Sequence, residues 1–322
     1  MSNIWKNLKE SKQPFCVLAP MDDVTDTVFR QIVAKHAPAD LMMTEFANAD
    51  GYCSPGKEAI SSRLRLSPSE GPVIAQIWGI NPDNYFTMAQ DLVAMGFVGI
   101  DINMGCPVKD MIKKGACSAM IQNPELASRV IAATIKGANG KVPVSVKTRI
   151  GFNTIDTEKW IGFLLQQKLD AIIVHGRTKK EMSKVPAHWD EVKKAVALRD
   201  KISPNTVIIG NGDVLTRAEA RERSEQTGVD GVMIGRGIFH NLFVFDETQT
   251  EHSLAEMLGI LVEHICLYQK TWGDNKSFEP LKKFFKLYIN GFDGSAQVRS
   301  KLMDTHSPQE ALDTIELILK KS

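Results

Sequence analysis

The chain has 322 residues, of which 43% are apolar and 24% are charged, and its formal net charge is +1. These values describe a globular protein with a sizeable core, and they exclude one that coats nucleic acid through overall charge. Neither a signal peptide nor an apolar run of the roughly 18 residues that a membrane span needs is present, so we expect a cytoplasmic protein with no membrane partner.

The cysteines are five in number and none forms a CxxC pair; they are Cys16, Cys53, Cys106, Cys117 and Cys266. This pattern argues against a disulfide framework, a zinc site or an iron–sulfur cluster. We therefore expect no metal, and redox chemistry would require an organic cofactor.

Eight short apolar runs occur along the chain, as expected for strands buried on both faces of a parallel sheet. In chain order they are Phe15–Ala19, Leu41–Thr44, Val73–Ile77, Val98–Ile102, Val144–Lys147, Ala171–Val174, Val207–Gly210 and Gly231–Ile234. Helix-like segments lie between them at Asn84–Met95, Pro124–Ile135, Thr157–Gln167 and Arg217–Ser224. Eight such units predict an α/β fold, a (β/α)₈ TIM barrel; a doubly wound sheet, the alternative, normally stops at about five or six strands.

In such a barrel the active site lies at the C-terminal ends of the strands. Nearly every run is followed there by polar or titratable residues, in order Met21, Glu45, Gln76, Asn103 with Cys106, Lys147 with Arg149, His175 with Arg177, Asn211-Gly212-Asp213 and Gly235-Arg236-Gly237. The last two loops combine glycine amides with an arginine, which suits a phosphate. Surface turns are commonly polar, so the prediction depends on the whole set.

The stretch Asn103-Met104-Gly105-Cys106-Pro107 places a thiol between a glycine and a proline on this rim. That position favours chemistry by Cys106, although a free cysteine is often a small buried apolar residue.

After residue 248 the strand pattern stops and helical periodicity takes over, which predicts a barrel over residues 1–248 and a small helical domain over 249–322. One apolar stripe comprises Leu254, Met257, Leu258, Leu261, Val262 and Ile265, and another comprises Leu281, Phe284, Phe285 and Tyr288. Ser307 and Pro308 predict the start of the last helix. Lys282, Lys283 and Lys286 are expected to share the face opposite the second stripe, either to bind phosphates or as an ordinary solvated surface.

Several motifs in a fixed order carry a family resemblance: Ala19-Pro20-Met21, Val24-Thr25-Asp26, NMGCPV, Lys147-Thr148-Arg149, VHGRT, NGD and DGVMIGRG. From about residue 15 to its C-terminal helices the chain resembles the tRNA-dihydrouridine synthases, flavin enzymes that reduce uridine in tRNA. The resemblance implies FMN at the barrel mouth. Pro20, Met21 and Gln76 would line its ring, Lys147 and His175 would contact the polar edge, and Asn211, Gly212, Asp213, Gly235 and Arg236 would hold the ribityl chain and phosphate.

In the implied mechanism NADPH reduces FMN, hydride passes from FMN N5 to uracil C6, and Cys106 donates a proton to C5. A thiol of ordinary pKa, about 8.5, is mostly protonated at neutral pH, so we expect Cys106 to act as a proton donor and not as a nucleophile. Asn103 would read the uracil edge with both its donor and its acceptor.

A stacked uracil must be extruded from tRNA, so basic residues should flank the pocket. The candidates are Lys109, Lys113, Lys114 and Arg177 in the barrel and Lys282, Lys283, Lys286 and Arg299 in the helical domain. We expect tRNA as the partner of a monomeric enzyme.

The chain departs from the family pattern at three places. Asp22 and Asp23 replace small residues near the expected flavin, Cys117 replaces a small residue and is interpreted as packing, and the segment before Trp189 differs, which weakens the expected RNA contacts there. Other classes of protein remain as alternatives. A Schiff-base aldolase would also use a strand-end lysine such as Lys147. A catalytically inactive RNA-binding protein would lose Cys106 or Lys147, and dihydropyrimidine or dihydroorotate dehydrogenases give no reason for the basic tail.

Overall fold

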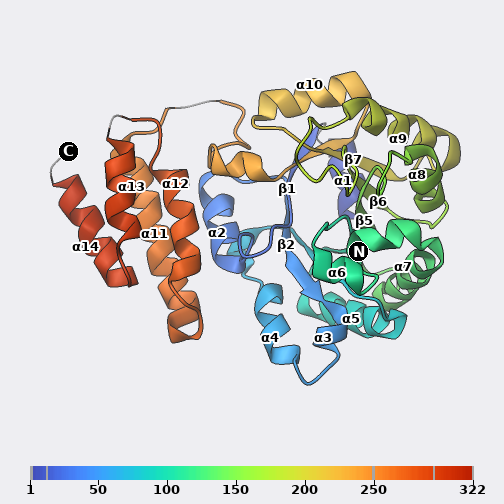
Figure 1. Cartoon of the computed structure of the whole chain (residues 1–322), viewed down its shortest axis with the longest axis horizontal. Coiled ribbons are helices and arrows are strands. Elements are labelled where there is room, and N and C mark those ends of the chain that lie inside the picture. The colour runs from blue at the N-terminus through green and yellow to red at the C-terminus, as the bar shows by residue number, and fades with distance from the viewer. Residues whose placement is uncertain (1–2, 12–13, 249–250, 293, 321–322) are drawn as a thin grey trace.

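Eight parallel strands form one closed barrel in the computed structural model, which describes residues 3–11, 14–248, 251–292 and 294–320 (Figure 1). Strands follow chain order around the barrel, and the last pairs with the first. Their bounds are β1 Phe15–Leu18, β2 Leu41–Asn48, β3 Val73–Trp78, β4 Gly99–Met104, β5 Val144–Arg149, β6 Ala171–His175, β7 Val207–Asn211 and β8 Gly231–Ile234. The predicted TIM barrel and all eight predicted strands are thereby confirmed.

The largest difference from the predicted bounds is in β2, which continues to Asn48 through a register shift between Met43 and Phe46. At the shift the Thr44 hydroxyl donates to the Glu45 carbonyl and accepts from the Gln76 main-chain N–H at 3.0 Å. The Thr44 side chain thus takes the place of a main-chain partner in the β2–β3 ladder. The residues after it include polar ones, so the apolar run used for the prediction ended before the strand does.

The helices α5 Pro82–Met95, α7 Pro124–Ala138, α8 Thr157–Leu165, α9 Trp189–Ile202 and α10 Arg217–Thr227 follow successive strands of the barrel (Figure 1). Local sequence explains where they begin: Asn81 and Asn123 cap α5 and α7, and each is followed by a proline at the first helical position. The other helices of the barrel are α1 Ile4–Ser11, α2 Thr27–His36, α3 Ala49–Tyr52, α4 Lys57–Ser61 and α6 Lys109–Lys113, with 3-10 turns η1 Ser62–Leu64, η2 Pro68–Glu70, η3 Cys117–Gln122 and η4 Arg236–Phe239.

Two apolar clusters lie on opposite sides of the strands. Phe15 and Val17 of β1 belong to an inner cluster, whereas Cys16 and Leu18 belong to an outer one beneath the helices. Trp5 of α1 joins the inner cluster next to Phe15, with ring centroids 6.2 Å apart. This two-sided burial is the physical reason for the uninterrupted apolar runs.

Along β6 and β7, inward-facing positions change from apolar to polar toward the C-terminal end. In β6 the inward residues Ala171 and Ile173 are followed two positions later by His175, and in β7 Val207 and Ile209 are followed by Asn211. Because side chains alternate across a strand, these polar groups enter the barrel mouth together. The fold thus collects the strand-end residues in one place.

The C-terminal helices are α11 Leu254–Trp272, α12 Phe285–Tyr288, α13 Ser295–Met303 and α14 Pro308–Leu319, with 3-10 turns η5 Gly273–Asn275 and η6 Glu279–Phe284. Phe284 packs against Phe29 of α2 with ring centroids 4.7 Å apart, and the outer apolar cluster of the barrel continues into these helices. Ser307 caps α14 as predicted, accepting from the Glu310 N–H at 3.2 Å. The expected domain boundary falls beside residues 249–250, outside the described residues, and stays a prediction. Among the described residues no helix has the length and apolar character to cross a bilayer.

Candidate active site

A pocket of about 440 Å³ opens at the C-terminal ends of the strands. Its lining includes these residues expected to hold the cofactor: Pro20, Met21, Lys147, His175, Asn211, Gly212, Asp213, Gly235 and Arg236. These come from strands β1, β5, β6, β7 and β8 or from the loops that follow them. The structure therefore brings together every residue of that expected set except Gln76.

Lys147 supplies a positive charge at the base of this pocket. Its Nζ donates to Asn211 Oδ1 at 3.1 Å, and the Asn211 amide is fixed in turn by donating to the Met233 carbonyl at 2.8 Å. Burial, reinforced by the nearby Arg149 guanidinium, lowers the pKa of Lys147 to about 8. The ammonium form consequently still predominates at neutral pH.

His175 is a neutral imidazole of defined tautomer. Burial, together with the surrounding cations, holds its pKa well below the ordinary value. Arg177 Nη1 lies 3.2 Å from His175 Nε2, and because a guanidinium has only donors, Nε2 must accept. The ring proton is therefore on Nδ1.

Arg177, expected as an RNA contact, lines the pocket but is held by internal partners. It is only 3% exposed; its Nε donates to the Val185 carbonyl at 2.5 Å and its Nη2 donates to Asp213. Although partial burial opposes the effect, the hydrogen bonds from Arg177 and from the Ala187 N–H lower the pKa of Asp213. Asp213 also lies 3.8 Å from Arg236, so it stands between two arginines on the side of the pocket where the phosphate is expected.

Gly212 has a backbone that other residues rarely adopt. Its φ is +133°, and a Cβ there would lie 2.7 Å from the Ala187 Cβ. Trp189 donates its Nε1 proton to the Gly212 carbonyl at 3.0 Å and packs where a Cβ on Gly210 would collide with its ring. Trp189 thus supports this loop of the pocket.

The loop that carries Cys106 is held from two sides. Asn103 Oδ1 accepts from the Gly105 N–H at 3.1 Å and from the Cys106 N–H at 2.9 Å. From β5, Arg149 donates its Nε proton to the Gly105 carbonyl at 2.7 Å. Arg149, expected only as one of the polar strand-end residues, is therefore an anchor of this loop.

These contacts correct two expectations. Asn103 cannot offer a free acceptor to a base, because its Oδ1 already accepts two main-chain protons while Nδ2 donates to Gln76 Oε1 at 2.9 Å. Gln76 is fully buried inside the barrel and does not line the pocket. Its other end donates to Asp101 at 2.7 Å, so it supports Asn103 from within the core.

Cys106 is more acidic than an isolated thiol, so its thiolate is more accessible near neutral pH than the ordinary pKa of a thiol predicts. Cys117 Sγ donates to Met111 Sδ at 3.7 Å. The hydrogen bond that the Cys117 thiol can give to an ionised Cys106, opposed by burial, lowers the pKa of Cys106 to about 7, and the same interaction raises the pKa of Cys117. Cys117 is buried, as its interpretation as a packing residue requires, but its contact with the Cys106 sulfur was missed.

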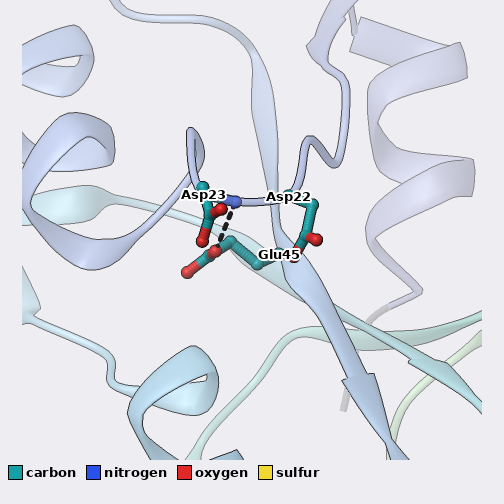
Figure 2. A group of neighbouring side chains, drawn as sticks. All are labelled: Asp22, Asp23 and Glu45. Carbon is teal, nitrogen blue, oxygen red and sulfur yellow. Dashed lines mark hydrogen bonds between the residues drawn. The ribbon is translucent and has the colours of Figure 1, made fainter. Parts of the chain in front are cut away.

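Asp22, Asp23 and Glu45 form an acidic group beside the rim, close enough together to share a cation. Figure 2 shows a Glu45 carboxylate oxygen accepting from the Asp23 N–H, at 2.7 Å. Arg63 donates to Asp22 and, at 3.0 Å, to Glu45. The Arg63 guanidinium thus pairs with one of the two extra aspartates, Asp22, and with Glu45.

The expected RNA-binding lysines differ in exposure. Lys109, Lys113 and Lys114 are exposed directly after the Cys106 loop, and Lys283 and Lys286 are exposed in the helical tail. Lys282 does not share their face: it is 6% exposed, pairs with Glu279 at 2.8 Å and donates to the Met303 carbonyl at 3.1 Å. Arg299 is partly buried and donates to the Ile289 carbonyl at 2.6 Å.

A TIM barrel with a cation-rich pocket and a firmly held thiol defines an enzyme active site at the C-terminal rim. The chain belongs to the dihydrouridine synthase family, whose model, described as Dihydrouridine synthase (Dus), matches residues 17–322. The family resemblance seen in the motifs is confirmed.

Curated relatives agree over nearly their whole length. A probable tRNA-dihydrouridine synthase of Staphylococcus epidermidis is 44% identical over 320 residues, covering 98% of this chain and 96% of the relative. A probable tRNA-dihydrouridine synthase 2 of Bacillus subtilis is 41% identical, covering 96% of this chain and 94% of the relative. Among solved structures, a 2-naphthoyl-CoA reductase complex matches with a TM-score of 0.54 at 9% identity, covering 75% of this chain and 52% of the other, a likeness of fold alone.

Proposed function

We propose that this enzyme reduces specific uridines of tRNA to 5,6-dihydrouridine, using FMN as cofactor and NADPH as reductant, and that it acts as a monomer in the cytoplasm. The observation that carries the proposal is the placement of Cys106: a thiol with a pKa of about 7 is held by Asn103 and Arg149 beside a cation-lined pocket.

The residues of the pocket fit FMN. Pro20 and Met21 give it a largely apolar wall. A Cβ on Gly235 would lie 3.5 Å from the Ala19 Cβ, so glycine leaves room at this wall. Arg236 is a suitable partner for the phosphate, and a volume of 440 Å³ falls in the usual range of small-molecule sites, about 300–1,000 Å³.

When bound, FMN would supply from N5 the hydride that reaches C6 of the uracil. Lys147 would stabilise negative charge at the polar edge of the flavin ring, because its ammonium lies in the pocket and is protonated at neutral pH. Neutral His175 would add a donor without adding charge, and Arg177 fixes its tautomer.

Cys106 would donate the proton that C5 requires. A general acid works best when its pKa is near the working pH, and a value of about 7 meets this condition. The Cys117 hydrogen bond would stabilise the thiolate left behind. Asn103 would contact the base only through the second hydrogen of Nδ2, since its oxygen is occupied.

For tRNA binding we propose Lys109, Lys113 and Lys114 beside the Cys106 loop and Lys283 and Lys286 on the tail. The tail is close to the rim, because Lys283 Nζ donates to the Asp23 carbonyl at 2.5 Å. Basic groups from both sides of the pocket suit a base that must be extruded from a folded RNA. Lys282 and Arg299 are left out because internal contacts occupy them.

The test is to purify the protein, load it with FMN and incubate it with NADPH and an unmodified tRNA transcript. The expected result is a yellow protein and dihydrouridine detected by nucleoside mass spectrometry. A colourless protein that does not take up FMN would contradict the proposal. Covalent trapping of an aldehyde on Lys147 by borohydride would instead support the aldolase alternative.

A further inference from the structure

Asp101 is a fully buried carboxylate in the middle of β4, inside an otherwise apolar run. Its register neighbours are Gln76 on β3 and Ser145 on β5. Ser145 Oγ donates to Asp101 Oδ1 at 2.6 Å, and Gln76 Nε2 donates to Asp101 Oδ2 at 2.7 Å. A buried charge needs such partners, and a position of this kind calls for an explanation.

Side-chain hydrogen bonds lead from this carboxylate to the Cys106 loop. Gln76 donates to Asp101 and accepts from Asn103 Nδ2 at 2.9 Å, and Asn103 Oδ1 then accepts from the main-chain N–H groups of Gly105 and Cys106. Asp101, Gln76 and Asn103, called here the amide chain, are all buried.

The amide chain has a direction because its two ends differ. An ionised carboxylate only accepts, whereas main-chain N–H groups only donate. Each amide between them must therefore present its NH₂ toward Asp101 and its oxygen toward the loop. Burial raises the pKa of Asp101 to about 6, so the carboxylate is ionised at neutral pH. If both amides were reversed, oxygen would face carboxylate and NH₂ would face N–H, leaving buried groups unsatisfied at each end.

We propose that Asp101 is a positioning residue for Cys106: it fixes the direction of the amide chain and thereby keeps the Asn103 oxygen on the main chain of the Cys106 loop. Whether this positioning affects catalysis rests on the proposed function of Cys106. The amide chain itself can be tested without turnover.

A second explanation for Asp101 is charge balance. Its carboxylate favours the charged form of Lys147 and so partly offsets the burial that lowers the pKa of that lysine. The Lys147 ammonium bonds to Asn211, however, and the two Asp101 oxygens bond to Ser145 and Gln76. The explanations predict opposite results for two substitutions. Charge balance makes Asp101→Asn harmful and Asn103→Asp neutral or favourable. The amide chain makes Asp101→Asn mild, because an asparagine oxygen still accepts from Gln76, and makes Asn103→Asp harmful, because a carboxylate then faces the Gln76 oxygen.

Exchanging the two residues should relieve the conflict. In Asp101→Asn/Asn103→Asp the Gln76 amide reverses, donates to residue 103 and accepts from residue 101, while the oxygens of residue 103 still accept from Gly105 and Cys106. A directional chain predicts this rescue, whereas charge balance, which makes Asn103→Asp neutral or favourable, gives nothing to rescue.

The experiment compares the two single variants, the double variant and Ser145→Ala at pH 8. It measures the thermal midpoint and the rate of Cys106 alkylation by iodoacetamide, resolved by peptide mass spectrometry with the exposed Cys53 as internal reference. For Asn103→Asp we expect a midpoint lower by about 3 °C or more and a Cys106 rate changed by about fivefold or more. The double variant should return within about twofold of the wild-type rate. Ser145→Ala, which leaves the direction intact, should leave the Cys106 rate unchanged.

Wild-type behaviour of Asn103→Asp, or a double variant no better than Asn103→Asp, would overturn the proposal. If Asn103→Asp does not fold, a folded double variant supports the amide chain and an unfolded one overturns it. None of these readouts uses FMN, NADPH or tRNA, so they stand apart from any failure of the proposed reaction.

Discussion

Cys106 and Cys117 are neighbours whose thiols influence each other: the Ser118 N–H donates to the Cys106 carbonyl at 3.4 Å, and the Cys117 thiol, whose Sγ donates to Met111 Sδ at 3.7 Å, acts on the Cys106 sulfur. This interaction between the thiols is the main cause that lowers the pKa of Cys106 to about 7. One thiol therefore sets the acidity of another that a proton-transfer step is proposed to use.

Replacing Cys117 by alanine should raise the pKa of Cys106, so that the thiolate fraction at pH 7 falls. The pH dependence of Cys106 alkylation measures this directly. Cys117→Ser retains a donor and should shift the profile less, which makes it the matched control at the same strained φ of +54°. If the alkylation profiles of Cys117→Ala, Cys117→Ser and the wild type were identical, Cys117 would not influence the pKa of Cys106.

Cys106→Ala should lower dihydrouridine formation by about 100-fold or more, as expected for loss of a general acid. Reduction of bound flavin by NADPH should stay near normal, because the substitution leaves the pocket lining unchanged. Stopped-flow absorbance separates the two half-reactions, and Cys266→Ala, at an exposed site in α11, is the control. Undiminished product yield would dismiss the acid role.

Lys147→Met should stabilise the fold while weakening FMN binding. The pKa of Lys147 is about 8 in the folded protein, against about 10.4 unfolded, so the unfolded chain binds more protons between these values and stability rises with pH across that window. Below pH 8 the cost of the buried charge is fully present. Methionine should therefore add on the order of 1 kcal/mol at pH 7, and the gain should shrink toward pH 10. Denaturant titrations at pH 7 and 9.5 test this, with the exposed Lys141→Met as reference. An equal gain at both pH values would contradict the linkage.

Gly212→Ala should destabilise the protein by about 1–3 kcal/mol, because the new Cβ meets Ala187 and the φ of +133° becomes strained. Adding Ala187→Gly to this variant should recover the stability lost to the clash between the two Cβ atoms. It should not recover the stability lost to the strained φ of residue 212. Thermal midpoints of the single and double variants separate the two contributions, and no recovery in the double variant would assign the whole effect to the backbone.

Replacing Lys283 and Lys286 together should weaken tRNA binding and reduce its salt slope by about 1–2. Lys282→Ala should instead lower stability and leave the slope unchanged, because this lysine is internal. Binding measured at several salt concentrations distinguishes them. If Lys282→Ala reduced the salt slope as much as replacement of Lys283 or Lys286, all three lysines would contact phosphates, contrary to the internal position of Lys282.

The strands and the rim were predictable because burial on both faces leaves a continuous apolar run, and because a closed barrel gathers all strand ends at one mouth. The directions in which individual side chains point could not be predicted from the sequence. Residues 279–284 form a 3-10 turn before the short helix α12, so the helical spacing assumed for Lys282, Lys283 and Lys286 does not hold. Arg177 turns inward because Asp213, far away in sequence, lies beside it. Asp101 is recognisable in the sequence as a charged residue within an apolar run. Its role could not be predicted, because it depends on hydrogen bonds with Gln76 and, through Gln76, with Asn103.

Apolar packing is continuous between α2 and the tail, so we expect the tail to unfold together with the barrel. Phe29 would lose its Phe284 neighbour, and Asp26 its contact with the Trp272 indole at 3.1 Å, if the chain ended at residue 248. A shortened chain of this kind would expose a wide apolar face and tend to aggregate. Calorimetry of the whole protein should show one heat-absorption peak in place of two.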